Sequence, residues 1–264
     1  MKYLAALLAF ICFFSEGKES LYSDLRFISV DEAPANYYDE TGGFSGYVTQ
    51  IVEQLQKQLQ IENEIEVMPE ARAMRTLDTK PNVIMFSISR TKERESNYHW
   101  LAHVLSKRWI FYSRIDSYFD ISSIQDIRKL KAVGVIRGDI REKWLRDNGV
   151  NNVVSILNYD NGVAMLMRGR IDLLFYESFG ILNTLQKLGY KNNSVTSQFV
   201  TAESDVYIVM SKSENSVVLT QKLQKQLSIL QASDWYKSHI AKWRDKLNEK
   251  HLADAWIKDG VLKY

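Results

Sequence analysis

Short apolar runs that predict strands alternate with helix-like segments along almost the whole chain after residue 24. The strand-like runs are rich in β-branched and aromatic residues, and the segments between them carry apolar residues at helical spacing. Strands separated by helices of about 10–15 residues form βαβ units with mostly parallel sheets. In the first part of the chain, strands are predicted at 25–30, 64–68 and 83–88, with helices at 47–59 and 71–77.

The same alternation continues to the C-terminal end. Further strands are predicted at 108–113, 132–136, 153–157, 171–175 and 206–210. Further helices are predicted at 123–130, 139–148, 162–168, 178–188, 217–231 and 233–248. Asp160 is expected to cap the helix 162–168, and Gly149, Gly169 and Gly189 are typical residues for ending helices. About nine or ten strands fit two small α/β lobes better than one large sheet.

Length and composition exclude several classes of protein. The chain has 264 residues, of which 45% are hydrophobic and 25% charged. This composition excludes a disordered chain, a collagen and a multi-span membrane protein. The formal net charge is only +2 and no basic run concentrates it. We therefore expect no nucleic-acid partner.

Residues 1–17 have the pattern of a secretory signal, with Lys2 before an apolar run and small residues near Gly17. The apolar run 3–14 is too short to span a bilayer, and no later stretch is long enough. We expect cleavage near Gly17 and export to the periplasm; an N-terminal anchor or a buried helix is the alternative. Cleavage would remove Cys12, the only cysteine, and leave no thiol or disulfide chemistry. Ile11 before Cys12 argues against lipidation.

One candidate for ligand binding follows the predicted strand 83–88. Ser87 and Ser89 lie at the end of this strand, and Arg94 follows five residues after Ser89. Hydroxyl and backbone N–H groups at a strand end can face a cleft, and a guanidinium nearby can hold a carboxylate by two hydrogen bonds. The alternative is that the serines only form a turn and that Arg94 is a solvated surface charge.

Two further candidates lie at predicted helix starts. Gly138 separates a strand from the helix that begins at Asp139, and the free N–H groups of such a start can bind an anion. The alternative is a plain turn with a glycine. Glu177 lies just past the carboxyl end of the predicted strand 171–175, at the start of the next helix. It can hold a cationic group of a ligand, or it can simply interact favourably with the helix dipole.

Three segments, in this order, resemble the extracytoplasmic solute-binding proteins of the amino-acid type, family 3. The first, Gly43-Phe44-Ser45-Gly46-Tyr47, leads into a helix. The second is Ser87-x-Ser89-x-Thr91-x-Glu93-Arg94. The third combines Val133-Gly134-Val135-x-x-Gly138 with Gly169-Arg170-Ile171-Asp172. The two last helices, with Trp235-Tyr236, also resemble that family, so that the resemblance covers about residues 22–248.

The resemblance implies an α/β clamshell of the type II periplasmic-binding-protein class, whose hinge the chain crosses twice. The first lobe would comprise 22–111 and 205–264, and the second lobe 112–204. Such proteins close on a small molecule, need no cofactor or metal, and are expected here as monomers. By position, Ser87 and Ser89 would line the first lobe, and Arg94 would hold an α-carboxylate of the ligand. In the second lobe, the helix start at Gly138, Asp139 and Ile140 would contact the same carboxylate. Glu177 would hold an α-ammonium group.

The sequence departs from the family pattern at several positions. Asp139 stands where a hydroxyl residue is usual, and we expect its charge to repel a carboxylate. Gln50 replaces a usual aspartate. The segment at Glu32 lacks the usual stacking aromatic, for which Tyr37, Tyr38 and Phe44 are candidates. Arg72 either reaches the cleft, where it would bind a second anion, or is a solvated helix charge. These departures leave open an amino acid, another carboxylate or another small polar solute as the ligand.

The predicted function is that of an exported substrate-binding protein that delivers a small solute to a membrane transporter. The alternatives are a ligand-sensing subunit of a membrane receptor and a clamshell-fold dehydratase. No nucleophile elbow, phosphate-binding loop or dinucleotide fingerprint occurs. His99 and His103 have helical spacing for a metal, but no third ligand is evident. We therefore predict neither an enzyme nor a metal site.

Overall fold

The structure is a computed structural model that describes residues 22–39, 41–213, 216–249 and 254–264. The predicted signal segment 1–17, with Cys12, lies outside these residues. Among the described residues, no helix is both long enough and apolar enough to cross a membrane.

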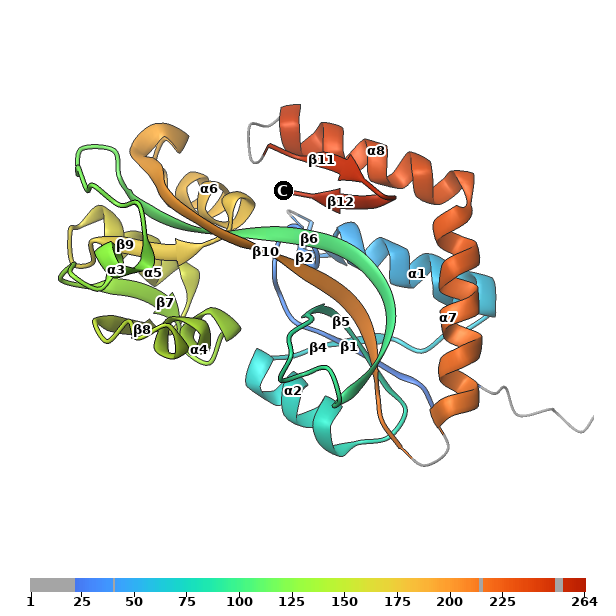
Figure 1. Ribbon diagram of the computed structural model, residues 1–264. Coiled ribbons are helices and arrows are strands. Elements are labelled where there is room, and N and C mark those ends of the chain that lie inside the picture. Colours follow the sequence, from blue (N-terminus) through green and yellow to red (C-terminus); the bar gives the residue numbers. More distant parts are fainter. Residues whose placement is uncertain (1–21, 40, 214–215, 250–253) are drawn as a thin grey trace, which may run out of the picture.

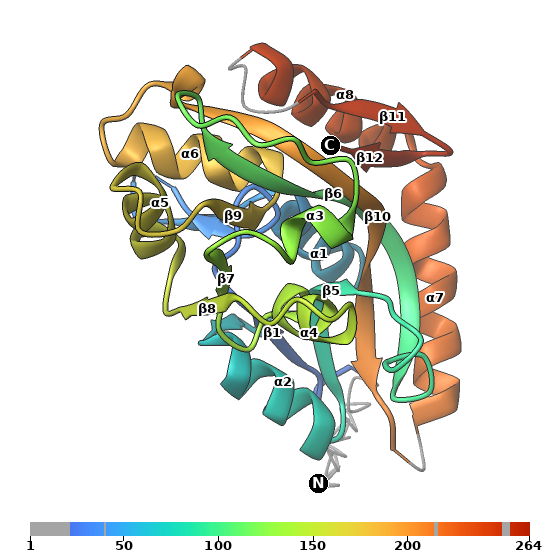
Figure 2. The ribbon, with the colours of Figure 1, turned by 60° about the vertical axis from the view of Figure 1, so that its left-hand side comes forward.

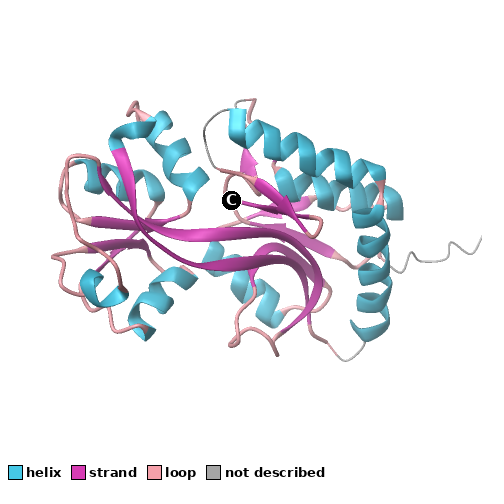
Figure 3. Cartoon of the chain, turned by 45° about the horizontal axis from the view of Figure 1, so that its top comes forward, coloured by secondary structure: helices cyan, strands magenta, loops and turns pink. Residues whose placement is uncertain are grey.

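Two long antiparallel strands, β6 (Tyr98–Arg114) and β10 (Val195–Ser211), run the length of the molecule and connect its two halves (Figures 1 and 3). They were predicted only over 108–113 and 206–210. Both strands carry polar residues at intervals, such as His103 and Lys107, and these interrupt the apolar runs on which the strand predictions rest. Several β-bulges along the pair bend and twist the two strands as they pass from one half to the other.

The first lobe has a parallel group of strands, β4-β1-β5, comprising β1 (Arg26–Ser29), β4 (Ile65–Val67) and β5 (Val83–Ser89). Alternate residues of these strands face opposite sides. Phe27 and Phe86 pack with helices α1 (Tyr47–Leu59), α7 (Ser216–Ala232) and α8 (Asp234–Glu249). Ile28 and Met85 pack with α2 (Glu70–Thr79) on the other side. The first lobe is thus a sheet covered by helices on both faces, and α7 follows the outer side of β6 (Figure 2).

The second lobe repeats this plan with β7 (Val133–Ile136), β8 (Val153–Ile156) and β9 (Leu173–Tyr176), which pair in parallel in the order β9-β7-β8. One face carries α5 (Tyr159–Met167) and α6 (Ser178–Lys187). The other face carries α3 (Ile124–Ile127) and α4 (Ile140–Asp147). Phe111 of β6 stacks on Phe175 of β9 with ring centroids 4.0 Å apart, which anchors β6 in this core. A short 3-10 helix, Asn192–Ser194, precedes β10.

Parallel pairing at both ends of the sheet and antiparallel pairing at its centre unite the strands into one ten-stranded sheet. The α/β class and the two lobes agree with the prediction, but the expectation against one large sheet is wrong, because β6 and β10 join the strands of both lobes into a single sheet. The boundaries predicted at 111/112 and 204/205 fall inside β6 and β10. One helix start differs. The residue that caps α5 is Asn158, whose side chain accepts a hydrogen bond from the N–H of Asn161. Asp160 lies inside the helix and pairs with Lys187 at 2.7 Å.

Four short strands were not predicted. β11 (Trp256–Lys258) and β12 (Val261–Lys263) form a C-terminal hairpin, and β12 adds to β6 in parallel. β2 (Tyr37–Tyr38) and β3 (Phe44–Ser45) form a separate two-stranded sheet before α1. Strands of two or three residues show little periodicity, and of those in this structure only β4 was predicted. The C-terminal hairpin nevertheless places Trp256 close to the hinge strands.

Candidate functional site

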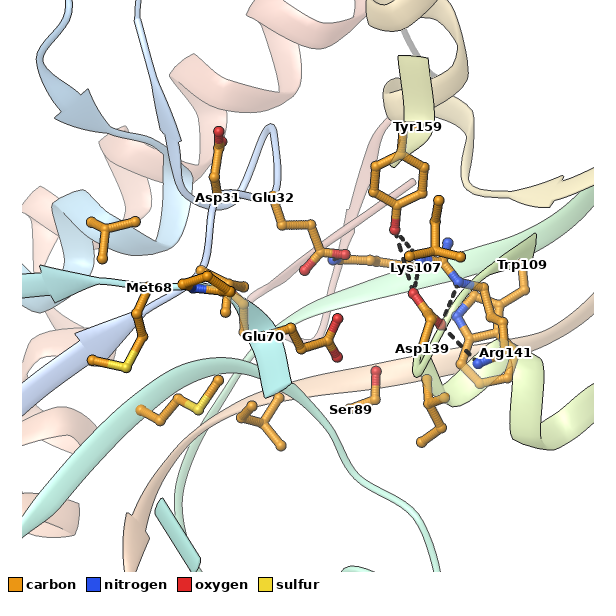
Figure 4. Close-up of a pocket in the computed structure, with 18 of the residues that line it drawn as sticks. Asp31, Glu32, Met68, Glu70, Ser89, Lys107, Trp109, Asp139, Arg141 and Tyr159 are labelled. Atoms are coloured by element: carbon orange, nitrogen blue, oxygen red, sulfur yellow. Dashed lines mark hydrogen bonds and ion pairs between the residues drawn. The ribbon is translucent and has the colours of Figure 1, made fainter. Parts of the chain in front are cut away.

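A cavity of about 440 Å³ lies between the lobes, on one side of the hinge strands. Its walls come from the first lobe (the loop after β1, the start of α2 and the end of β5) and from the second lobe (the start of α4 and of α5). Figure 4 shows these groups facing one another. Of the predicted ligand-binding residues, the cavity brings together Tyr38, Ser87, Ser89, Arg94, Asp139 and Ile140.

The end of β5 lies in an unusual backbone conformation. Ser87 has φ 69, a left-handed value that costs free energy in a residue other than glycine. Its hydroxyl donates to the Oδ1 of buried Asn36 at 2.8 Å. The hydroxyl of Ser204, on β10, donates to that of Ser89 at 2.9 Å. These bonds fix Ser87 against the segment between β1 and β2, and Ser89 against β10, at the edge of the cavity.

Arg94 is the cation in the cavity that is left without an acidic partner among the described residues. It lies in the turn after β5, where its backbone N–H donates to the carbonyl of Thr91. Its guanidinium makes one long bond, from Nη1 to the carbonyl oxygen of Ser89 at 3.3 Å. The side chain is partly exposed. Its charge is therefore available to an anion that enters the cleft.

Glu70, the first residue of α2, points into the same space (Figure 4). It forms no ion pair with the described residues, and its side chain reaches solvent. Protein on both sides of the cleft raises the pKa of the Glu70 carboxyl to about 7, and the charges of Asp139 and Glu32 add to the rise. Asp31 also lines the cavity, and there too desolvation raises the pKa of the carboxyl. The first-lobe wall therefore offers acids as well as Arg94.

A buried ion pair forms the base of the cavity. The Nζ of Lys107, on β6, lies 2.7 Å from an Oε1 of Glu32, and the two side chains are 6% and 20% exposed. Each of these charges is satisfied by the other, so that neither is free for a ligand.

A second paired group lies on the second-lobe wall. Asp139 caps α4 by accepting the N–H of Arg141 at 2.7 Å, and its two oxygens also accept from the guanidinium at 2.9 and 2.5 Å. The same guanidinium donates to the hydroxyl of Tyr159 at 2.6 Å and lies over the ring of Tyr176. Burial opposes ionisation of Asp139, but the charge and hydrogen bonds of Arg141 outweigh it and hold the pKa of Asp139 below its ordinary value.

This pairing bears on the expected repulsion of a carboxylate by Asp139. The negative charge is neutralised by a guanidinium on the same turn of helix, so that the second-lobe wall is close to neutral. The residue pattern Asp-x-Arg at a helix start predicts such a pair, because a capping aspartate accepts a hydrogen bond from the residue two positions later.

The sequence matches the bacterial extracellular solute-binding proteins, family 3, over residues 26–246. The chain belongs to this family. No curated protein matches it.

Solved structures share the architecture of this solute-binding protein. A histidine kinase sensor domain with similarity to periplasmic binding proteins has a TM-score of 0.74 at 15% identity, covering 84% of this chain and 96% of that one. The P235GK mutant of ArgBP from T. maritima has a TM-score of 0.71 at 21% identity, with 83% and 94% covered. The ancestral amino acid-binding protein AncCDT-1, a precursor of cyclohexadienyl dehydratase, has 0.66 at 18%, with 83% and 94% covered. The likeness confirms the two-lobed fold.

Four predicted ligand residues of the solute-binding protein do not line the cleft cavity. Phe44 packs edge-to-face on Tyr38 with ring centroids 5.2 Å apart. Arg72 is exposed on α2, as expected for a solvated helix charge. The N–H of Gly138 already donates to the Oε2 of Glu142 at 2.7 Å, so that it is not free for an anion.

Glu177 is the fourth, and it has a structural role. Its side chain is 1% exposed and caps α6 by accepting the N–H groups of Phe179 and Gly180 at 2.9 and 2.6 Å. These contacts are the ones expected of an acid at a helix start, the second of the two alternatives for this residue.

Glu70, Lys107, Arg141 and Tyr159 were missed by the sequence analysis. Lys107 and Arg108 stand side by side in a mostly apolar stretch, and charges in a buried strand are themselves a signal for paired or functional groups. Glu70 gives no such signal, because an acid in the first turn of a helix is common.

Burial of Glu177 is expected to make stability depend on pH. Burial raises its folded pKa to about 7, from an ordinary value of 4.5. The folded protein therefore binds this proton more tightly than the unfolded chain. The contribution of Glu177 to the free energy of unfolding falls as pH rises from about 4.5 through 7. Urea denaturation of Glu177→Gln should show the wild type losing stability relative to the variant over this range. A difference that does not change with pH would contradict the buried carboxyl; exposed Glu62→Gln is the control.

Proposed function

We propose that this protein binds a small solute that carries both a carboxylate and a cationic group, an amino acid or a close relative, and delivers it to a membrane transporter. The observation that carries this proposal is the set of charged side chains in the cavity lining that have no partner of opposite charge. Lys107 is occupied by Glu32, and Arg141 by Asp139. The remaining charged groups in the lining are Arg94 as a cation and the acids Asp31 and Glu70.

A zwitterion matches this set of charges. A ligand carboxylate would bind the guanidinium of Arg94, where two parallel hydrogen bonds are possible. A ligand ammonium would lie toward Glu70. Burying a ligand charge is tolerated only where it is paired and hydrogen-bonded. Approach of the second lobe, with Ile140 and Tyr159, would exclude water from both pairs, so that binding and closure are linked.

Sensing is a second candidate, supported by the likeness to a histidine kinase sensor domain. Transport and sensing share the same cleft and differ only in the membrane partner. A dehydratase is the third reading, supported by the likeness to a dehydratase precursor. Incubation of the ligand with the protein and NMR analysis of the solution separate it from the others, because only an enzyme would convert the ligand.

A thermal-shift screen tests the proposal. Residues 18–264 would be heated with amino acids, organic acids, amines and small peptides. A ligand at a hundred times its Kd stabilises the native state by about 2.7 kcal/mol and raises the melting temperature. We expect the largest shifts from amino acids. Shifts from plain carboxylates alone, or from amines alone, would contradict the proposal.

Glu70→Gln is expected to weaken binding of the zwitterion on the order of tenfold, as for loss of one charge-assisted hydrogen bond. Because the pKa of Glu70 is about 7, its carboxylate becomes charged as pH rises, and wild-type affinity should increase between pH 6 and 8. The variant should lack this increase. Titration calorimetry at several pH values measures both effects. Exposed Glu64→Gln, outside the cavity, is the matched control; equal affinities for Glu70→Gln and this control would exclude contact with the ligand.

A further inference from the structure

A second cavity, of about 610 Å³, lies on the other side of the hinge. Successive residues of β6 face opposite sides of the sheet. Lys107 and Trp109 line the cleft, whereas Arg108, Ile110 and Tyr112 line this rear cavity. The two cavities are therefore back to back across the same strand.

The walls of the rear cavity belong to different lobes. Ser178 and Leu182 come from α6 in the second lobe, and Asn248 and Trp256 come from the C-terminal part of the first. Figure 1 shows α6 and the C-terminal hairpin above the long strands, and α2 and α4, which border the cleft, below them. Rotation of the lobes about β6 and β10 therefore changes both cavities at once.

Polar groups in this rear cavity lack partners within the described part of the chain. The Nε of Arg108 and the hydroxyl of Ser178 are buried and make no hydrogen bond, and Ser178 is only 8% exposed. Arg108 forms no ion pair among the described residues. Glu203, which pairs with it in the strand register, is bound to Lys263 at 2.6 Å. Unpartnered buried donors are unfavourable, and an acceptor group supplied from outside would satisfy them.

The remaining surface of the cavity is largely apolar. The guanidinium of Arg108 lies 4.9 Å from the ring centre of Trp256, and Ile110, Leu182 and Val200 add aliphatic surface. Asp254 also lines the cavity but is exposed, so that solvent screens its charge more than that of Arg108. A cation with free donors beside an aromatic ring suits an anionic group attached to an apolar body.

We propose that the rear cavity is a second ligand site, specific for a small organic carboxylate. The carboxylate binds at Arg108 and Ser178, and the apolar body lies against Trp256 and Leu182. We infer this site regardless of which ligand binds in the cleft.

Benzoate is the probe for this site, and benzylamine, with the same ring and the opposite charge, is its matched control. Saturation-transfer NMR would be recorded on residues 18–264 and on variants. We expect saturable binding of benzoate that persists in Arg94→Ala and weakens at least tenfold in Arg108→Gln. Val200→Trp, which fills the cavity from an exposed position on β10, should also abolish binding and does not remove Arg108.

Three results would overturn the proposal. One is the absence of saturable benzoate binding with a Kd below about 10 mM, which is the weakest range that such a site would reach. Another is binding that is lost in Arg94→Ala and kept in Arg108→Gln, which would place benzoate in the cleft. The third is equal binding of benzylamine. Failure of the cleft proposal would instead appear as unchanged amino-acid affinity in Arg94→Ala.

Discussion

Replacement of Arg94 by alanine is expected to weaken binding of the zwitterionic ligand by a hundredfold or more and to leave thermal stability almost unchanged. Loss of one partner from a desolvated, hydrogen-bonded charge pair typically costs about 2–5 kcal/mol of binding free energy. Without a ligand the guanidinium makes a single bond of 3.3 Å to a backbone carbonyl, so that little of the fold depends on it. Calorimetric titration with the amino acid found in the screen gives the affinity, and a melting curve gives the stability.

Arg90→Ala is the matched control for this prediction. Arg90 lies on the same segment, but its guanidinium pairs with Glu95 and lies over the rings of Trp100 and Tyr207, outside the cleft cavity. This variant should keep the affinity. Arg94→Lys should bind with intermediate strength, because an ammonium retains the charge but not the two-pronged geometry. Wild-type affinity in Arg94→Ala would show that the ligand carboxylate lies elsewhere.

Replacement of Asp139 by alanine is expected to destabilise the fold by about 3–5 kcal/mol, the usual cost of leaving a buried charge without its partner. Asp139 and Arg141 have side chains that are 8% and 5% exposed, and the guanidinium would lose two hydrogen bonds along with its counterion. Urea denaturation measures the change. The variant also loses the cap of α4.

The cap and the ion pair are separated by two further variants. Asn158→Ala removes the cap of α5 without touching an ion pair, and it should cost only about 1 kcal/mol. Asp139→Ala combined with Arg141→Met removes both charges and should recover part of the lost stability, since a well-packed apolar pair can replace a buried ion pair. If Asp139→Ala and Asn158→Ala lowered the free energy of unfolding equally, the buried Asp139–Arg141 pair would stabilise the fold no more than a helix cap does.

Local patterns in the sequence were sufficient for most of the fold. The bounds of α1 match the predicted 47–59, because its apolar residues recur at helical spacing, and α6 begins at the predicted Ser178. The long hinge strands were seen only in part. Some of their polar residues, such as Lys107 and Arg108, face cavities rather than bulk solvent, and no local pattern distinguishes these situations.

The site was harder to predict than the fold, because one of its two ion pairs joins residues that are far apart in the sequence. Lys107 on β6 pairs with Glu32 in the loop after β1. This pairing changes which charges remain for a ligand. Arg94 and the two serines were found because they stand at a strand end. Glu70 enters the cleft through the arrangement of α2 against the second lobe, which depends on tertiary structure alone.

Alternation along β6 assigns successive residues between Lys107 and Tyr112 to opposite sides of the hinge. Odd-numbered Lys107 and Trp109 belong to the cleft, and even-numbered Arg108, Ile110 and Tyr112 belong to the rear. A deletion or insertion of one residue here would exchange the two sets, since a one-residue slip moves every side chain to the opposite face. Arg108 would then occupy the base of the cleft, and Lys107 would lose Glu32. This part of β6 should therefore tolerate substitutions better than insertions or deletions, because a change in length would disturb both cavities.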